Sequence, residues 1–293
     1  MTRLAVLTSR LDLPVHRELE QAAARAGHEM VVLDALRCVA QAQPARLLAY
    51  PDAGVLAGIA AVLPRIGNWR GDSALAALSA LEAAGVPSLN ASHAVRVGRD
   101  HWLTAQCLAD AGIAHPETVA GAEPQALAQA AALVCGVPCV VKHRHSRRGI
   151  GVLRCASVPE LEAVLDSLWR VGEEVVVQRF CPPGGVCRRV LVLEGEVLGA
   201  TEHAAVPPEF RANATRGARV RAVALEAELA VLARRAAQAV GLGFAGIDLL
   251  PDGTRWVVGE VNPSPGWTHF AAATGVAVAE RVVAALARLG TQP

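Results

Sequence analysis

The sequence predicts a protein of mixed α/β and α+β class, in which an N-terminal lobe of alternating strands and helices precedes two α+β lobes. The alternation fills the first 92 residues and is typical of a small parallel sheet. Later apolar segments are joined by tight turns at 194–196 and 251–253, which indicates antiparallel pairs. With 293 residues, 53% of them hydrophobic, the chain can bury several cores.

The N-terminal lobe is expected to span residues 1–92 and to be Rossmann-like. Its first turn, residues 8–11, contains no glycine, whereas a dinucleotide site needs a glycine-rich turn at this place. The sequence therefore disfavours a nicotinamide-dependent dehydrogenase. Strands are predicted at 3–8, 30–33, 60–64 and 86–89, and helices at 16–26 and 73–84.

A central α+β lobe is expected at residues 93–174, followed by a C-terminal α+β lobe at residues 175–293. In the central lobe the pattern predicts helices at 95–111, 125–135 and 159–168, and strands at 137–142 and 152–155. In the C-terminal lobe it predicts strands at 174–180, 188–193, 197–200, 246–250 and 256–261, and helices at 225–240 and 278–289.

Composition excludes several classes of protein. A net charge of +1 gives no global attraction to nucleic acid or to an anionic membrane, and charged residues make up only 19% of the chain. The opening segment lacks the pattern of a secretory signal. The seven cysteines show no metal-binding spacing, which is typical of reduced thiols in a reducing compartment. We therefore expect a cytoplasmic protein with no nucleic-acid or membrane partner.

Lysine usage points to one position. Of the 28 lysine and arginine residues only Lys142 is a lysine, at the end of a predicted strand. A lysine kept against such a bias indicates a site that needs a compact ammonium group, although chance alone could also leave one. The following loop contains Gly149 and Gly151, whose backbone N–H groups can approach the same anion. A solvated basic hairpin is the alternative interpretation of residues 143–148.

Hard oxygen ligands gather on the last strand pair. Asp248 lies on one predicted strand, and Glu260 and Asn262 lie on the next. Because the strands are joined by a tight turn, Asp248 and Glu260 are side by side if both face the same way. Carboxylate and amide oxygens suit magnesium with bound phosphate, whereas solvent-facing acids at a hairpin edge are the plainer alternative. Together with Lys142, these residues predict a nucleoside triphosphate site.

Several motifs in chain order resemble those of the ATP-grasp superfamily, and within it the RimK-type amino-acid (glutamate) ligases. The resemblance runs along nearly the whole chain. The matching segments are Leu-Pro-Arg-Ile-Gly (63–67), Gly-Val-Pro-Ser-Leu-Asn (85–90), Gly-Ile-Ala-His-Pro-Glu-Thr (112–118), Pro-Cys-Val-Val-Lys (138–142), Phe-Arg-Ala-Asn (210–213), Ala-Gly-Ile-Asp (245–248) and Glu-Val-Asn-Pro-Ser-Pro-Gly (260–266).

This resemblance implies an ATP-grasp fold and an ATP-dependent carboxylate–amine ligase that works through an acyl phosphate. ATP and Mg²⁺, for which Mn²⁺ can substitute, would be the cofactors. An amino acid such as glutamate would be added to a carboxylate-bearing protein, peptide or small molecule, and the enzyme would be a homo-oligomer. The chemistry is phosphoryl transfer, in which positioning and charge neutralisation do most of the catalysis.

The resemblance also assigns roles to individual residues. Asp248, Glu260 and Asn262 would bind the metal ions, and Arg189 would lie near the transferred phosphoryl group, with Arg211 as a second catalytic arginine. A third group of residues, to which Arg211 also belongs, would contact the nucleotide. This group consists of Lys142, His101, Gly149, Gly151, Gln178, Arg179, Phe180, Arg211 and Asn213.

Four departures from the family pattern keep another hypothesis open. His101 stands where the family has a second lysine, Arg179 where it has glutamate, and Cys187 where it has an acid. The basic run that the family has after Glu202 is absent. A nucleotide-binding or regulatory protein of the same fold without ligase turnover is the alternative. Nucleic-acid binding through residues 144–148 is the weakest hypothesis, because no aromatic residues interleave the run.

Overall fold

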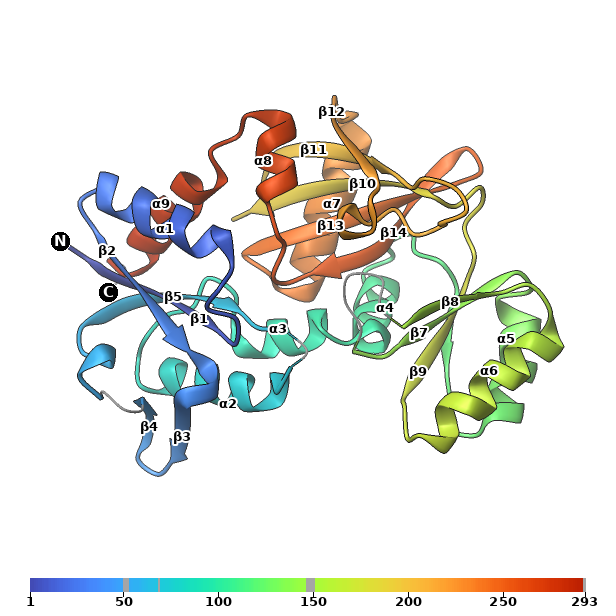
Figure 1. The fold of residues 1–293 in the computed structure, drawn as a ribbon, viewed down its shortest axis with the longest axis horizontal. Helices are drawn as coiled ribbons and strands as arrows, with labels where there is room; N and C mark the ends of the chain where they lie inside the picture. The colour runs from blue at the N-terminus through green and yellow to red at the C-terminus, as the bar shows by residue number, and fades with distance from the viewer. Residues whose placement is uncertain (50–52, 68, 146–150, 292–293) are drawn as a thin grey trace.

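A three-stranded parallel sheet of order β2-β1-β5 forms the N-terminal lobe (Figure 1). The computed structural model describes residues 1–49, 53–67, 69–145 and 151–291. Helices pack on both faces of this sheet, as the predicted alternation requires. The elements of this lobe that the sequence predicts are β1 Arg3–Thr8, α1 Pro14–Arg25, β2 Glu29–Asp34, β5 Ile59–Arg65 and α2 Gly71–Ala83.

Two features of the N-terminal lobe differ from the prediction. An antiparallel hairpin, β3 Cys38–Ala42 and β4 Ala45–Ala49, was not expected, because its alanines and glutamines have low strand propensity. The strand predicted at 86–89 is only a single parallel bridge between Ser88 and Val62. Pro87 has no N–H to donate, so the segment cannot extend into a regular ladder.

The single helix predicted at 95–111 is two helices, α3 Ser92–Gly98 and α4 His101–Asp110. Asp100 separates them, since its Oδ1 accepts hydrogen bonds from the backbone N–H groups of Trp102 (2.9 Å) and Leu103 (3.1 Å). A carboxylate in this position is a favourable N-cap, and it starts a new helix. His101 therefore lies in the first turn of α4.

The central sheet is antiparallel, with the order β6-β9-β7-β8, and its two helices pack on the outer face (Figure 1). Strand β9 pairs with β6 and β7, although the predicted boundary after residue 174 assigns this segment to the C-terminal lobe. The three-lobe division with its boundaries stays a prediction. The elements are β6 Thr118–Ala120, α5 Pro124–Val134, β7 Cys139–His143, β8 Val152–Cys155, α6 Val158–Arg170 and β9 Val175–Arg179.

The C-terminal sheet has five antiparallel strands in the order β12-β11-β10-β13-β14. Of its elements, β12 and α8 were not predicted from the sequence, whereas the last helix has the predicted bounds. The elements are β10 Val186–Leu193, β11 Glu196–Ala204, β12 Arg219–Val223, α7 Ala227–Val240, β13 Phe244–Asp252, β14 Arg255–Asn262, α8 Thr268–Thr274 and α9 Val278–Leu289.

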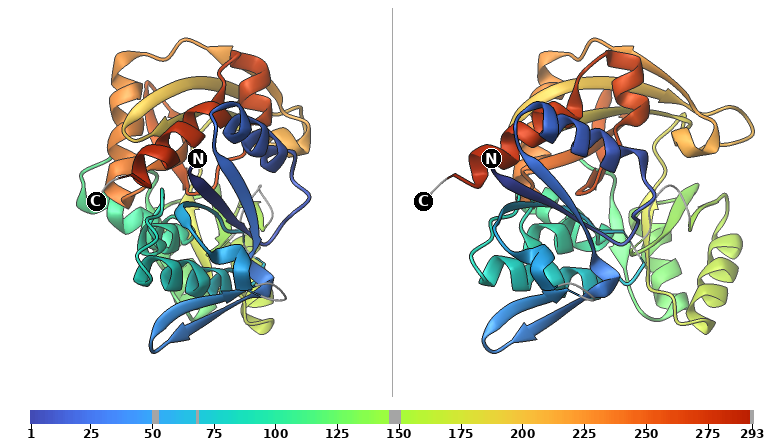
Figure 2. Two further views of the ribbon diagram at one scale, coloured as in Figure 1. Left: turned by 90° about the vertical axis from the view of Figure 1, so that its left-hand side faces the viewer. Right: turned by 60° about the vertical axis from the view of Figure 1, so that its left-hand side comes forward.

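Both faces of the C-terminal sheet are buried. Val190 and Ile247 pack under α7, on one face. Leu191 and Phe244 point to the other face, where they share one core with α1, α9 and the inner face of the N-terminal sheet. Helices α1 and α9 lie side by side in this shared core (Figure 2). The N-terminal lobe and the C-terminal sheet are thus joined through their interior.

Asn90 connects the same two parts through hydrogen bonds. Its side chain is fully buried, donates to the carbonyls of Phe244 (2.7 Å) and Pro263 (2.9 Å), and accepts from the Phe244 N–H (2.8 Å). These bonds fix the start of β13 and the segment that follows β14. The open end of the strand pair that bears Asp248 and Glu260, opposite its connecting turn, is therefore held from the N-terminal lobe.

In the part of the chain that the structure describes, no single helix is both long and apolar enough to cross a membrane. Helices α8 and α9 satisfy this criterion only when taken together, and the two are bent by 114° at the break between them.

Replacing Asn90 by alanine is expected to lower the free energy of unfolding by roughly 3 kcal/mol, because three buried backbone groups lose their partner. Denaturant unfolding of the wild type and the variant measures this difference. Gln238→Ala, which truncates an exposed side chain on α7, is the control and should change stability by less than about 0.5 kcal/mol. Equal effects of the two substitutions would contradict the role given to Asn90.

Candidate functional site

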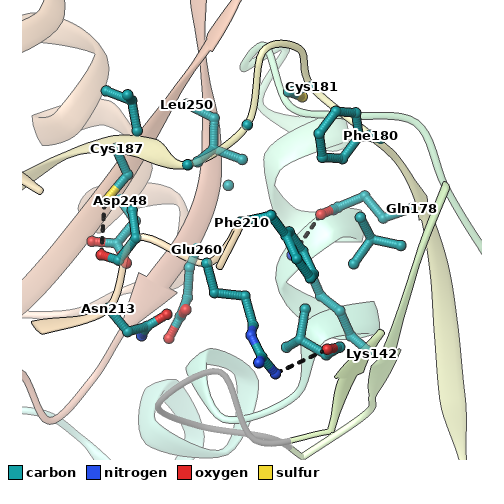
Figure 3. A pocket seen from close by; sticks show the side chains of 18 of the residues that line it. Lys142, Gln178, Phe180, Cys181, Cys187, Phe210, Asn213, Asp248, Leu250 and Glu260 are labelled. Carbon is teal, nitrogen blue, oxygen red and sulfur yellow. Dashed lines mark hydrogen bonds between the residues drawn. The ribbon is translucent and has the colours of Figure 1, made fainter. Parts of the chain in front are cut away.

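A pocket lies between the central sheet and the C-terminal sheet, and residues from both sheets line it (Figure 3). It brings together most of the residues that the sequence predicts for the site, from segments far apart in the chain. The predicted residues on its wall are His101, Lys142, Gln178, Arg179, Phe180, Arg211, Asn213, Asp248 and Glu260.

The register of three strands places the charged groups of the C-terminal sheet in one row. Asp248 on β13 lies opposite Glu260 on β14, which confirms the predicted side-by-side arrangement. On its other side Asp248 lies opposite Arg189 on β10. The Arg189 guanidinium donates from Nε to Oδ1 (2.7 Å) and from Nη2 to Oδ2 (2.6 Å) of Asp248. Burial alone lowers the pKa of Arg189, but the adjacent Asp248 carboxylate raises it overall.

The donor set suits a magnesium ion that also binds phosphate. Asp248 and Glu260 supply hard carboxylate oxygens on the pocket wall, and Mg²⁺ commonly takes one or two carboxylates together with substrate phosphates. Asn262 is not among the residues on the wall, and its Oδ1 accepts a hydrogen bond from the Ser264 N–H (2.9 Å). Among the described residues, no group of three His, Cys, Asp or Glu side chains could hold a metal without further ligands.

Lys142 reaches the pocket from the end of β7. Its Nζ donates to Oε1 of Gln178 (2.6 Å; Figure 3), and Nε2 of Gln178 donates to Oγ1 of Thr118 (3.0 Å). Burial lowers the pKa of Lys142 overall, although the charges of Glu260 and Asp248 act in the opposite direction. The ammonium is held by Gln178, and both ends of the Gln178 amide are occupied by side chains.

Glu209 holds Arg211 and was not predicted from the sequence. Its Oε1 accepts from the backbone N–H (3.0 Å) and Nε (2.8 Å) of Arg211, and its Oε2 accepts from Nη2 (2.7 Å). These hydrogen bonds lower the pKa of Glu209 to about 2. Arg211 also donates from Nη1 to the carbonyl of Val152 on β8 (3.3 Å), on the other side of the cleft. The signal in the sequence was an acid two residues before the motif arginine.

Arg179 is bound by protein carboxylates. Its guanidinium contacts Glu117, which precedes β6, and Asp252, at the end of β13. His101 also lines the pocket, and its backbone N–H donates to the carbonyl of Arg144 (3.0 Å). Neither Glu117 nor Asp252 was predicted as a site residue, because nothing in the local sequence links them to Arg179.

Two glycines of the predicted phosphate loop follow Lys142 in the chain. Gly149 lies outside the described residues. Gly151 has a φ of +69°, and a Cβ on it would lie 2.1 Å from Cδ2 of His143. Only glycine fits this position, which fixes the return of the chain into β8.

Uncharged groups stand at two of the departures from the family pattern. Burial raises the pKa of Cys187 well above its usual value, so this pocket residue is a neutral thiol. Burial and the charge of Arg189 lower the pKa of His203 to about 4. At neutral pH neither side chain brings a charge to the C-terminal side of the cleft.

Comparison with known proteins gives two family matches that together span nearly the whole chain. The RimK PreATP-grasp domain matches residues 2–95, and the RimK-like ATP-grasp domain matches residues 98–286. A protein of Thioalkalivibrio sulfidiphilus named probable alpha-L-glutamate ligase is 34% identical over 282 residues, which are 96% of this chain and 94% of that protein.

Solved structures agree in fold. The RimK domain protein ATP-grasp of Sphaerobacter thermophilus has a TM-score of 0.74 and 25% identity, over 98% of this chain and 100% of that one. The ATP-grasp ligase PsnB, solved in complex with a minimal precursor, has a TM-score of 0.73 and 23% identity, over 97% of this chain and 98% of that one.

Glu209→Gln is expected to lower the free energy of unfolding at pH 7 by about 1 kcal/mol, because the ion pair with Arg211 is partly exposed and screened. The pKa of Glu209 is depressed in the folded state, so its contribution is complete above its ordinary value and is lost as the pH falls toward 2. Denaturant unfolding between pH 7 and pH 3 measures the difference, which should shrink below about pH 4.5.

The exposed Glu162→Gln on α6 is the control for this series. A destabilisation by Glu209→Gln that stays constant down to pH 3 would show that the carboxylate charge is not what stabilises this segment.

Proposed function

Because this chain belongs to the RimK-like ATP-grasp family, we propose that the pocket holds ATP and that the product is an amide between an amino acid and an acceptor carboxylate. The enzyme is an ATP-dependent carboxylate–amine ligase with the ATP-grasp fold, as the resemblance predicts. The observation that carries the site assignment is that Lys142 and the Asp248–Glu260 pair meet across one cleft from different sheets.

The reaction that fits this site has two steps. An oxygen of the acceptor carboxylate attacks the γ-phosphorus of ATP, and the bond to the bridging oxygen breaks, which releases ADP. The uncharged amino group then attacks the acyl phosphate, loses a proton and expels inorganic phosphate. Because little covalent work falls to the protein, its task is to position the reactants and neutralise their charge.

The chain's own residues supply this charge on both sides of the cleft. Lys142 would hold the α- and β-phosphates, with its ammonium oriented by Gln178. Asp248 and Glu260 would hold Mg²⁺ or Mn²⁺, which neutralises phosphate charge when bound. Each oxygen of Asp248 accepts one hydrogen bond from Arg189 and keeps a second lone pair that could bind metal, so Arg189 would lie beside the metal and near the transferred phosphoryl group. Arg211 lies on the pocket wall, where it contacts Glu209 and the carbonyl of Val152, and it would stabilise the charge of the transferred phosphoryl group.

The substrates are proposed from the relatives. Curated relatives are named probable alpha-L-glutamate ligase, which makes glutamate the first amino acid to test. Two fold neighbours, PsnB and MdnC, were solved in complex with precursor peptides, which supports a peptide or protein acceptor. The seven free thiols favour a reducing compartment, and we propose that the enzyme works in the cytoplasm as a homo-oligomer.

Glu260→Gln is expected to lower the rate of amino-acid-stimulated ADP formation by at least about 100-fold, since it removes one of two anionic ligands for the metal. The rate is measured with glutamate and a panel of peptides, and Glu162→Gln is the matched control. Unchanged ADP formation in Glu260→Gln would refute the metal assignment. Tight ATP binding by the wild type without product from any acceptor would favour the nucleotide-binding alternative.

Thermal unfolding with and without Mg-ATP tests the nucleotide site independently of turnover. At about 100 times its dissociation constant, a ligand stabilises the folded state by roughly 2.7 kcal/mol, so the wild-type midpoint should rise by several degrees. Lys142→Ala should lose most of this increase, because the buried ammonium is removed. A wild type that shows no increase would refute the assignment of the pocket to ATP.

A further inference from the structure

Arg179 joins the two sheets that enclose the pocket. It is the last residue of β9 in the central sheet, and Asp252 is the last residue of β13 in the C-terminal sheet. Nη1 and Nη2 of Arg179 donate to Oδ1 (2.9 Å) and Oδ2 (3.0 Å) of Asp252, and Nε donates to Glu117. A two-point contact of this kind fixes the orientation of both partners as well as their distance.

Burial and additional contacts hold this group in place. The side chains of Asp252 and Arg179 are only 11% and 23% exposed. The hydrogen bond from Arg179 is the largest cause that lowers the pKa of Asp252, and the same is true for Glu117. Arg255 donates to Oδ2 of Asp252 (3.2 Å) from within the same hairpin. Both carboxylates are therefore ionised at neutral pH, and both can accept hydrogen bonds from the Arg179 guanidinium.

The segment around Arg179 forms part of the pocket wall. Arg179 and its two neighbours, Gln178 and Phe180, all line the pocket, and the Gln178 amide binds Lys142. A rotation of the central sheet against the C-terminal sheet would therefore move Lys142 relative to Asp248 and Glu260. The contact between Arg179 and Asp252 lies where it opposes such a rotation.

We propose that Arg179 and Asp252 form a clamp that sets the angle between the central and C-terminal sheets and preorganises the cleft for nucleotide. Arg179 is then a positioning residue whose charge is directed at protein carboxylates. The effect on nucleotide affinity rests on the proposed function. If the clamp is lost, only a fraction of molecules has the binding geometry, and the apparent dissociation constant rises in inverse proportion to that fraction.

Asp252→Asn tests the clamp, with Asp166→Asn as the matched control because Asp166 pairs with Arg170 on the exposed side of helix α6. Calorimetric titration with Mg-ATP should give a dissociation constant about tenfold higher for Asp252→Asn and an unchanged one for the control. The KM for ATP should rise in parallel, with kcat within twofold of the wild type. A fall in kcat at constant KM would overturn the proposal.

A double-mutant cycle with Arg179→Ala, Asp252→Ala and the double variant distinguishes loss of the Arg179–Asp252 contact from a general disturbance of the fold. If the clamp is correct, the double variant binds Mg-ATP no more weakly than the weaker single variant. Additive losses would overturn the proposal. Glu117→Gln, which leaves the contact with Asp252, should cause a smaller loss than Asp252→Asn, and folding of every variant is checked by thermal unfolding.

Small-angle X-ray scattering of the nucleotide-free protein tests the clamp independently of ATP binding. The radius of gyration should increase in Asp252→Asn and stay unchanged in Asp166→Asn. Equal values in the wild type and both variants would overturn the clamp. A wild type that binds no Mg-ATP would refute the proposed function, while the scattering comparison would still test the clamp.

Discussion

The antiparallel register of β10, β13 and β14 is the constraint on which the site depends. It puts Arg189, Asp248 and Glu260 in one row across three strands. Neighbouring residues such as Val190 and Ile247 fill the core under α7. Since a slip by one residue would exchange the buried and the polar sets, the apolar packing that stabilises the sheet also enforces the geometry of the carboxylates. Stability and chemistry are thus specified by the same strands.

Three arginines around the cleft are partnered by acids of the chain itself, whereas Lys142 binds the Gln178 amide. Arg189 binds Asp248, Arg211 binds Glu209, and Arg179 binds Asp252. Breaking a partly buried ion pair leaves a charge without compensation, so each pair opens readily only when another charge replaces the partner. A nucleotide with its metal supplies charges of both signs. Under the proposed function the pairs of Arg189 and Arg211 would exchange with substrate charges, whereas the pair of Arg179 joins the two sheets.

The features that could be predicted from the sequence are those that a local pattern of residues determines. The last helix, the first strand and the pairing of Asp248 with Glu260 follow from periodicity and a tight turn, and the structure has them. Longer-range choices were not predictable in this way. The sequence predicts the β9 strand itself, but it does not predict which sheet the strand joins. That choice depends on which neighbouring strands are available for pairing, and in the structure these are β6 and β7. The break at Asp100 required weighing a capping carboxylate against a continuous apolar pattern. The contacts of Glu209 and Asp252 depend on where separate loops meet.

The shared core beneath α1 and α9 divides the molecule unequally. The N-terminal lobe and the C-terminal sheet enclose one interior and are joined again by Asn90, whereas the central sheet with α5 and α6 has a core of its own. If the cleft opens, the central sheet with Lys142 is the part that would move, while Asp248 and Glu260 stay fixed to the larger body.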